Sequence, residues 1–102
     1  MRAENSLGKM RNYGIIPKSL MQDKNLSIHA KAVYAYLATY ADKNGKCYPS
    51  YELMEYELNV AESTLRKYLK ELVTKGHLKR DQEKRKGKFA HNIYVLCVDK
   101  QG

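Results

Sequence analysis

Long hydrophobic runs are missing from this chain of 102 residues. Its most apolar stretch, residues 33–41, is far shorter than the roughly 20 residues that a membrane-spanning helix requires. Residues 1–12 are polar and lack the apolar segment of a signal peptide. These absences argue against a membrane span and a secretory leader, so we expect a soluble, cytoplasmic protein.

Cysteine is scarce, and the two that occur, Cys47 and Cys97, lie far apart. The chain has no Cys-x-x-Cys or His-x-x-x-His spacing, so it offers no ligand framework for zinc. In a cytoplasmic protein we expect two buried free thiols rather than a disulfide. No carboxylate pair, glycine-rich phosphate loop or nucleophile motif accompanies His29, His77 and His91. The sequence therefore predicts a protein that is not an enzyme and binds no metal or other cofactor.

Acidic residues are few relative to basic ones, with 11 Asp and Glu against 19 Lys and Arg. The formal net charge of +8 favours a polyanionic partner. Residues 62–88 hold ten cations and four acids, a net charge of +6, whereas the segment before them contains Glu52, Glu55 and Glu57. A single lysine run is usually only solvated surface. Because these cations fall on two neighbouring elements that would meet one duplex, their distribution favours nucleic-acid binding.

The length leaves room for one small domain, and 43% hydrophobic with 29% charged residues is typical of a globular chain. We place this domain at residues 13–98, between a flexible N-terminal tail at residues 1–12 and a C-terminal tail at residues 99–102. Ser27 is a suitable N-cap for a helix at residues 28–42, which Asn44-Gly45 would end. Before it, residues 18–21 are expected to form a single helical turn.

Two more helices follow, separated by a tight turn at residues 59–61. The first begins at Pro49-Ser50 and has Leu53, Tyr56 and Leu58 on one face. The second occupies residues 62–75 before Gly76. Its apolar residues recur in steps of three and four and predict one buried stripe: Leu65, Tyr68, Leu69, Leu72 and Val73. We interpret the tyrosines at positions 36 and 40 as core packing rather than base-stacking residues.

Two β-rich segments, residues 77–80 and 89–98, come after the helices. Residues 81–88 between them carry a turn glycine and four cations, and are predicted to form a wing that lies along a phosphate backbone. Residues 47–48 would add a third strand. This order predicts an α+β fold, a winged helix-turn-helix with a three-helix core and a small antiparallel β-sheet.

In such a fold the polar face of the helix at residues 62–75 reads DNA. We expect Ser63, Thr64 and Lys67 to face base edges, with Glu62 in the same first turn, and Arg66 and Lys70 to reach base edges or flanking phosphates. At the start of the preceding helix, Ser50 and Tyr51 are candidates for phosphate contacts. The wing cations would hold the adjacent backbone or enter the minor groove: Lys84, Arg85, Lys86 and Lys88.

The chain resembles the winged helix-turn-helix domain of phage and plasmid replication initiators and DnaD-like replisome organisers of Gram-positive bacteria. The resemblance covers residues 13–97. It rests on Ile16-Pro17-Lys18, Leu20-Met21, Leu26-Ser27-Ile28 with Ala30-Lys31 and Tyr34, Tyr48-Pro49-Ser50, Leu58-Asn59-Val60 with Ser63-Thr64, Leu69-Lys70-Glu71-Leu72 before Gly76, and Asn92 with Tyr94.

The resemblance implies double-stranded DNA binding in plasmid or phage replication initiation, or in transcriptional regulation, without catalysis. It also implies replication proteins as partners and, in longer members, a C-terminal oligomerisation domain that this chain does not supply. The isolated domain is expected to be a monomer. Ala61 departs from the family, whose members often carry a helix-capping serine there.

Two other functions remain open from the residues alone. Winged helices also dock partner proteins without reading DNA, although exposed apolar anchors would then be expected in place of Arg66, Lys67 and Lys70. RNA binding usually relies on exposed aromatic residues, and tyrosines placed mostly in the core would argue against it.

Overall fold

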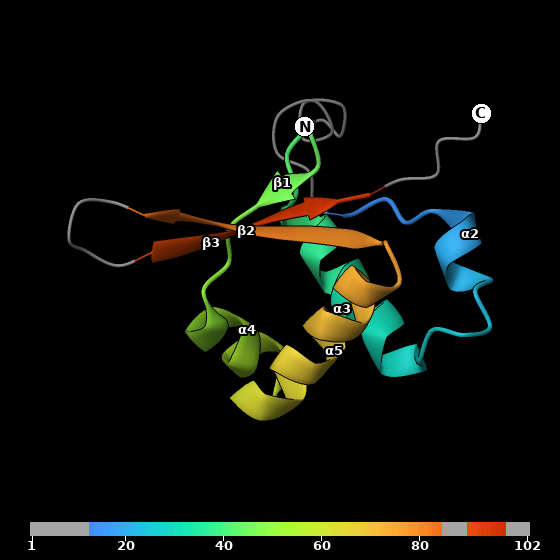
Figure 1. Ribbon diagram of the computed structural model, residues 1–102, viewed down its shortest axis with the longest axis horizontal. Helices are drawn as coiled ribbons and strands as arrows, with labels where there is room; N and C mark the ends of the chain where they lie inside the picture. Colours follow the sequence, from blue (N-terminus) through green and yellow to red (C-terminus); the bar gives the residue numbers. More distant parts are fainter. Residues whose placement is uncertain (1–12, 85–89, 98–102) are drawn as a thin grey trace, which may run out of the picture.

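The computed structural model describes residues 13–84 and 90–97. Four helices and a small sheet follow one another along this part of the chain (Figure 1). The elements are α2 (Lys18–Met21), α3 (Ile28–Tyr40), β1 (Lys46–Cys47), α4 (Tyr51–Leu58), α5 (Glu62–Thr74), β2 (Leu78–Lys84) and β3 (Ala90–Leu96). The predicted tails, at residues 1–12 and 99–102, lie outside the described residues.

Serine caps begin two of the longer helices, as the sequence predicts for Ser27. The Ser27 hydroxyl accepts a hydrogen bond from the backbone N–H of Ala30 at 3.0 Å, and the Ser50 hydroxyl accepts one from the N–H of Leu53 at 3.1 Å. Such a bond satisfies one of the N–H groups that a helix start leaves without a partner. Ala61 supplies no such bond to α5.

Left-handed residues terminate the helices of the helix-turn-helix. Asn59 ends α4 with a φ of 57°, and Gly76 follows α5 with a φ of 82°. Asparagine and glycine tolerate this conformation better than other residues. The turn at residues 59–61 is therefore short, and α5 starts immediately after it.

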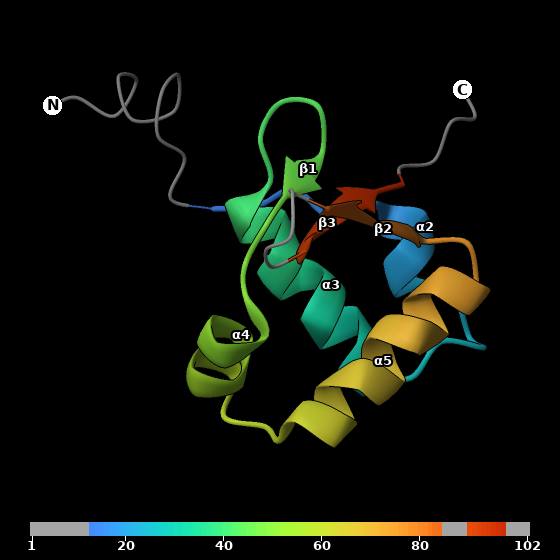
Figure 2. The ribbon, with the colours of Figure 1, turned by 60° about the vertical axis from the view of Figure 1, so that its left-hand side comes forward.

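The hydrophobic core lies between the helices and the sheet. The apolar stripe of α5 faces α3, and Leu65, Leu69 and Leu72 are completely buried there. Figures 1 and 2 show α3 and α5 packed together beneath the sheet, with α4 to one side below the two long strands. Burial of these side chains removes apolar surface from water and is the main force that fixes the orientation of α5.

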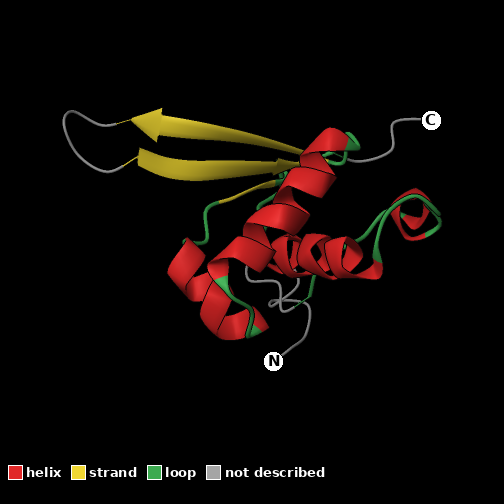
Figure 3. Ribbon diagram, turned by 60° about the horizontal axis from the view of Figure 1, so that its bottom comes forward, coloured by secondary structure: helices red, strands yellow, loops and turns green. Residues whose placement is uncertain are grey.

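The three strands form one antiparallel sheet in the order β1-β3-β2. Tyr94 at the centre of β3 pairs with Cys47 on one side and with Arg80 on the other. The strands β2 and β3 continue past the helices as a two-stranded ribbon, on the same side as α4 (Figure 3). This arrangement confirms the predicted α+β winged helix-turn-helix.

Element boundaries differ from the predicted ones at several points. The strand β2 continues to Lys84 instead of ending at Arg80, because residues 81–84 pair with residues 90–93 of β3. The helix α3 ends at Tyr40, since Ala41 is extended with a ψ of 143°. The short strand β1 starts one residue earlier than predicted, at Lys46.

Some side chains predicted to be buried are not. Tyr56, from the predicted apolar face of α4, is 84% exposed, and the buried residue of this helix is Met54. Tyr40 is 42% exposed, and its hydroxyl joins that of Tyr36 in donating to Glu57 Oε1, at 2.5 and 2.7 Å. Val73 is also exposed. The core of α3 lies instead on Ala30, Val33, Tyr34, Leu37 and Ala38.

The two cysteines are both free, in agreement with the prediction. Only Cys47 is fully buried, and burial raises the pKa of its thiol to about 12. Cys97 is half-buried, which corrects the expectation of two buried thiols.

Candidate nucleic-acid interface

The helix α5 presents a polar face to solvent. Its exposed residues share the side opposite the leucine stripe: Ser63, Lys67, Lys70 and Thr74. Thr64 is half-buried and Glu62 is exposed at the helix start. The structure therefore brings three of the predicted side chains, Ser63, Lys67 and Lys70, onto one accessible surface, and places Thr64 at its edge.

One contact fixes α5 against the first turn of α3. The Glu71 carboxylate accepts the backbone N–H of Ser27 at 2.7 Å and the Ser27 hydroxyl at 2.8 Å. These bonds to Ser27, chiefly the one from its N–H, lower the pKa of Glu71 below its ordinary value. On the same side of α5, the Tyr68 ring stacks on His29 with 5.0 Å between ring centroids. The polar face is consequently held at a fixed orientation to the rest of the domain.

Arg66 lies on the other side of α5, towards α4 and the sheet. Its Nε and Nη2 atoms bind Glu62 Oε2 at 2.8 and 2.6 Å, one turn earlier in the helix. Its guanidinium carbon lies 4.6 Å from the centroid of the Tyr51 ring. The hydrogen bond that Arg66 donates to Glu62, together with the electrostatic effect of Tyr51, raises the pKa of Arg66. A guanidinium held by both groups has lost much of its rotamer freedom before any ligand arrives.

Tyr51 also contacts the sheet, because Arg80 Nη1 donates a hydrogen bond to its hydroxyl at 3.3 Å. Tyr51, Arg66 and Arg80 thus form an Arg-Tyr-Arg cluster, with one residue each from α4, α5 and β2. A hollow of about 380 Å³ lies at this cluster, completed by Asp81 and Asn92. We call it the junction pocket, since it lies where the helix-turn-helix meets the base of the wing.

The residues predicted to contact phosphates lie in different parts of the structure. Tyr51 lies in the junction pocket, and Ser50 is exposed at the start of α4 with its hydroxyl engaged in the helix cap. Lys84 is the last residue of β2. Arg85, Lys86 and Lys88 lie outside the described residues, and so does the side chain of Lys84.

Sequence reasoning did not select Arg80. Arg80 follows Lys79 in a short basic strand. Adjacent strand residues point to opposite faces of a sheet, and the sequence alone does not show which of the two residues faces the helices. The register places Arg80 beside Tyr94, on the face towards Tyr51. Correct pairing of β2 with β3 would have identified it, together with Asn92 and Tyr94.

The tyrosines divide between the core and the surface. Of the nine, Tyr34 and Tyr94 are fully buried and three more pack partly buried against the core, while four are exposed: Tyr13, Tyr40, Tyr48 and Tyr56. The exposed ones weaken the argument against RNA that rested on buried tyrosines. Single-stranded nucleic acid and RNA need to be tested directly.

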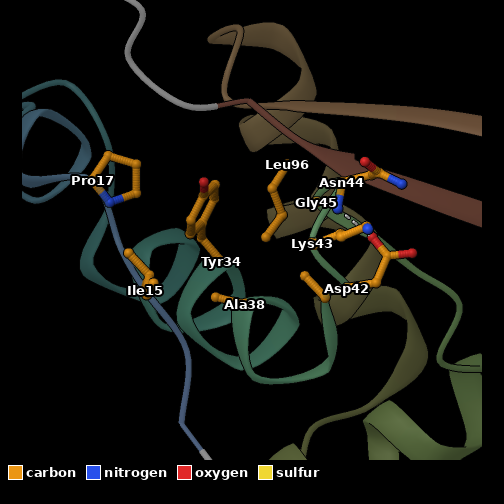
Figure 4. Close-up of a pocket in the computed structure, with 10 residues that line it drawn as sticks. Ile15, Pro17, Tyr34, Ala38, Asp42, Lys43, Asn44, Gly45 and Leu96 are labelled. Atoms are coloured by element: carbon orange, nitrogen blue, oxygen red, sulfur yellow. Dashed lines mark hydrogen bonds between the residues drawn. The ribbon is translucent and has the colours of Figure 1, made fainter. Parts of the chain in front are cut away.

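An apolar pocket of about 450 Å³ lies away from α5, between the chain before α2 and the loop before β1. Figure 4 shows Tyr34, Ala38 and Leu96 at its centre, with Ile15 and Pro17 on one side and residues 42–45 on the other. The Tyr34 hydroxyl is already used, since it donates to the Cys97 carbonyl at 3.1 Å. This pocket gathers no converging charges and is not part of the candidate interface.

Within residues 13–84 and 90–97, no group of three or more His, Cys, Asp or Glu side chains could hold a metal ion. In the same part of the chain, no helix is long and apolar enough to cross a membrane.

Comparison with known proteins gives one family. A family model described as a helix-turn-helix domain matches residues 24–78, from the turn before α3 to the first residue of β2. No curated protein and no solved structure gives a significant match. The matched segment is more than half of the chain and contains α3, α4 and α5 in the arrangement described above. The chain therefore belongs to the helix-turn-helix domain family, whose members use this unit to bind DNA.

Proposed function

We propose that this protein binds double-stranded DNA, with α5 in the major groove and the wing on the adjacent backbone. The observation that carries the proposal is the polar face of α5. Ser63, Lys67 and Lys70 are exposed on it, and the leucine stripe and the Glu71–Ser27 contact hold it in place. A rigid helix with short polar and basic side chains on one face is the element that helix-turn-helix proteins insert into the major groove.

Each residue has an assigned role in this proposal. Ser63, Thr64 and Lys67 face base edges near the start of α5, and Lys70 reaches base edges or phosphates one turn later. Ser50 contributes at the start of α4, where backbone N–H groups favour a phosphate. The wing residues Lys84, Arg85, Lys86 and Lys88 supply affinity through the backbone.

The biological role that we propose is initiation of plasmid or phage DNA replication, or transcriptional regulation by a related module. The support is the resemblance to replication-initiator winged helices over residues 13–97. The domain acts on DNA as a monomer unless a second domain or a partner assembles it, and no enzymatic step is required.

The test is fluorescence anisotropy with a labelled random duplex of about 25 base pairs, titrated at several salt concentrations. Single-stranded DNA and duplex RNA serve as competitors. We expect tightest binding to duplex DNA and a steep loss of affinity with salt, because phosphate contacts release counterions. Lys67→Ala with Lys70→Ala should weaken binding strongly, whereas the charge-matched pair Lys24→Ala with Lys43→Ala should not.

Two results would reject the proposal. Preference for single strands or RNA would assign the exposed Tyr48 and Tyr56 a stacking role instead. Absence of binding at low salt, despite the net charge of +8, would favour a protein-interaction module that uses the winged-helix fold without reading DNA.

A further inference from the structure

We propose that the junction pocket is a binding site for one phosphate group, and that this group belongs to the DNA backbone between α5 and the wing. The inference rests on the proposed function and identifies where the first fixed contact with the duplex is made. Four side chains from four elements would take part: Tyr51, Arg66, Arg80 and Tyr94.

Both arginines line the pocket. Glu62 accepts from Nε and Nη2 of Arg66, a contact that does not involve the Nη1 atom. Arg80 donates to the Tyr51 hydroxyl through Nη1, a contact that does not involve its Nε and Nη2 atoms. The Arg66 guanidinium lies over the Tyr51 ring and Arg80 binds the hydroxyl of the same residue, so two planar guanidinium groups approach the pocket from different elements. A tetrahedral phosphate accepts hydrogen bonds from several directions and suits such an arrangement.

The buried hydroxyl of Tyr94 is an independent observation that points to a ligand. Tyr94 is 0% exposed, and within the described part of the chain no group meets its hydroxyl in good hydrogen-bond geometry, although Tyr51 and Asn92 lie close to it. Burial is the main reason why its pKa lies above the ordinary value, and the nearby Tyr51 raises it further, so the phenol stays protonated as a donor. A buried polar group normally has a partner, and an exception calls for an unobserved water, ion or ligand.

The location of Tyr94 connects this hydroxyl with the pocket. Tyr94 is the cross-strand neighbour of Arg80, and Arg80 and Tyr51 both affect its titration. Arg66 is also influenced electrostatically by Tyr94. Cross-strand partners share one face of a sheet, so the Tyr94 side chain lies behind the pocket lining, on the face where the Arg-Tyr-Arg cluster lies.

A carboxylate at this site contributes to its selectivity. Glu62 is paired with Arg66 on the outer edge of the pocket. It offsets one of the two arginines, so a free anion in bulk solvent gains less from long-range attraction. A phosphate brought in by the contacts of α5 and the wing gains the local hydrogen bonds at little extra entropic cost. This difference favours a backbone phosphate over inorganic phosphate.

The test measures duplex binding of the whole chain across a salt series for Arg80→Gln, Tyr94→Phe and the control Lys43→Ala. Arg80 and Lys43 are both exposed, so both charge changes are compatible with folding. We expect Arg80→Gln to lower affinity roughly tenfold on every duplex and to reduce the slope of log K against log salt by about one. Tyr94→Phe should lower affinity about threefold with an unchanged slope, because it removes a donor and no charge. Lys43→Ala should leave the affinity within about twofold and the slope unchanged.

The outcomes separate this inference from the proposed function. If the unaltered protein does not bind duplex DNA, the proposed function fails and this inference with it. If it binds, but Arg80→Gln and Tyr94→Phe both behave as Lys43→Ala does, the phosphate site is rejected while DNA binding stands.

A second measurement distinguishes the source of the phosphate. Nuclear magnetic resonance titration with inorganic phosphate follows the side-chain Nε–H signals of Arg66 and Arg80. Weak, unsaturated shifts up to about 10 mM phosphate would support a site that needs the duplex. Saturation at micromolar phosphate, lost in Arg80→Gln without a change in duplex affinity, would overturn the backbone assignment.

Discussion

Glu71 of α5 acts as the second cap of α3, because its two carboxylate oxygens accept the N–H and the hydroxyl of Ser27 at 2.7 and 2.8 Å. Ser27 in turn accepts the N–H of Ala30 at 3.0 Å. A negative charge at a helix N-terminus is favourable, since the free N–H groups there carry partial positive charge. One residue of α5 thereby stabilises the start of α3 and links the orientations of the two helices.

Removal of this contact should destabilise the domain. Glu71→Ala leaves the Ser27 N–H without its acceptor. We expect the free energy of unfolding to fall by about 1 kcal/mol, because the site is partly exposed and a hydrogen bond to a charged group is weaker there than in the core. Thermal and urea unfolding would measure it. A Lys67→Ala variant, altered on the solvent side of the same helix, should unfold like the unaltered protein.

The same contact predicts a pH dependence of stability. The pKa of Glu71 in the folded protein lies below its ordinary value of 4.5, owing first to the Ser27 N–H. A carboxylate of this kind stabilises the fold fully above its unfolded pKa, and the contribution is lost as the pH falls through the folded value. The stability difference between the unaltered protein and Glu71→Gln should therefore shrink below about pH 4.5. A difference that stays constant down to pH 3 would contradict the assignment.

Ala61→Ser should stabilise the protein. The backbone of Ala61, at φ −77° and ψ 159°, almost equals that of the N-cap Ser50 at φ −77° and ψ 162°. A serine hydroxyl there would reach an N–H of the first turn of α5, worth about 1 kcal/mol. Differential scanning calorimetry should show a melting temperature higher by roughly 4–8 °C. The reverse change at α4, Ser50→Ala, should lower it by a similar amount.

Tyr94→Phe should separate stability from DNA binding. Its buried hydroxyl makes no hydrogen bond of good geometry within residues 13–84 and 90–97, so its removal should leave stability unchanged or raise it by up to about 1 kcal/mol. The same change should weaken duplex binding if the hydroxyl donates to a phosphate. A clear loss of stability would show that the hydroxyl is already satisfied in the free protein, and would count against the phosphate site.

The wing prediction concerns Lys84, Arg85 and Lys86, changed together to alanine. Phosphate contacts carry little sequence information, so we expect similar weakening on all duplexes and a smaller salt slope. Competition among several unrelated duplexes measures both effects. Unchanged affinity would remove the wing from the proposed interface.

Sequence selectivity should depend on α5. Once a preferred site has been selected, Lys67→Ala should reduce discrimination at one or two positions by roughly 1–3 kcal/mol, as expected for loss of a base contact. Arg66→Ala should lower affinity about equally on all sequences if Arg66 holds a phosphate with Arg80. Position-specific loss for Arg66→Ala would instead assign it to a base edge.

The helix α5 was predictable from sequence because its signals are local. The repeat of Leu65, Leu69 and Leu72 defines a buried side, and the remaining positions of the same helix follow from its geometry. Ser27 and Ser50 were likewise identifiable as caps, since a cap depends on bonds to residues only three positions away. Local period and capping thus determined the order of helices, the turn between them and the polar face.

Tertiary structure alone decided what assembles around Tyr51. Arg66 is 15 residues away from it and Arg80 is 29 residues away, and no local pattern links the three. Their contact depends on the strand register, which places Arg80 opposite Tyr94. A one-residue shift would move Arg80 to the other face of the sheet. The exposure of Tyr56 was decided in the same way, because apolar spacing shows which residues share a helix face but not whether a neighbour covers it.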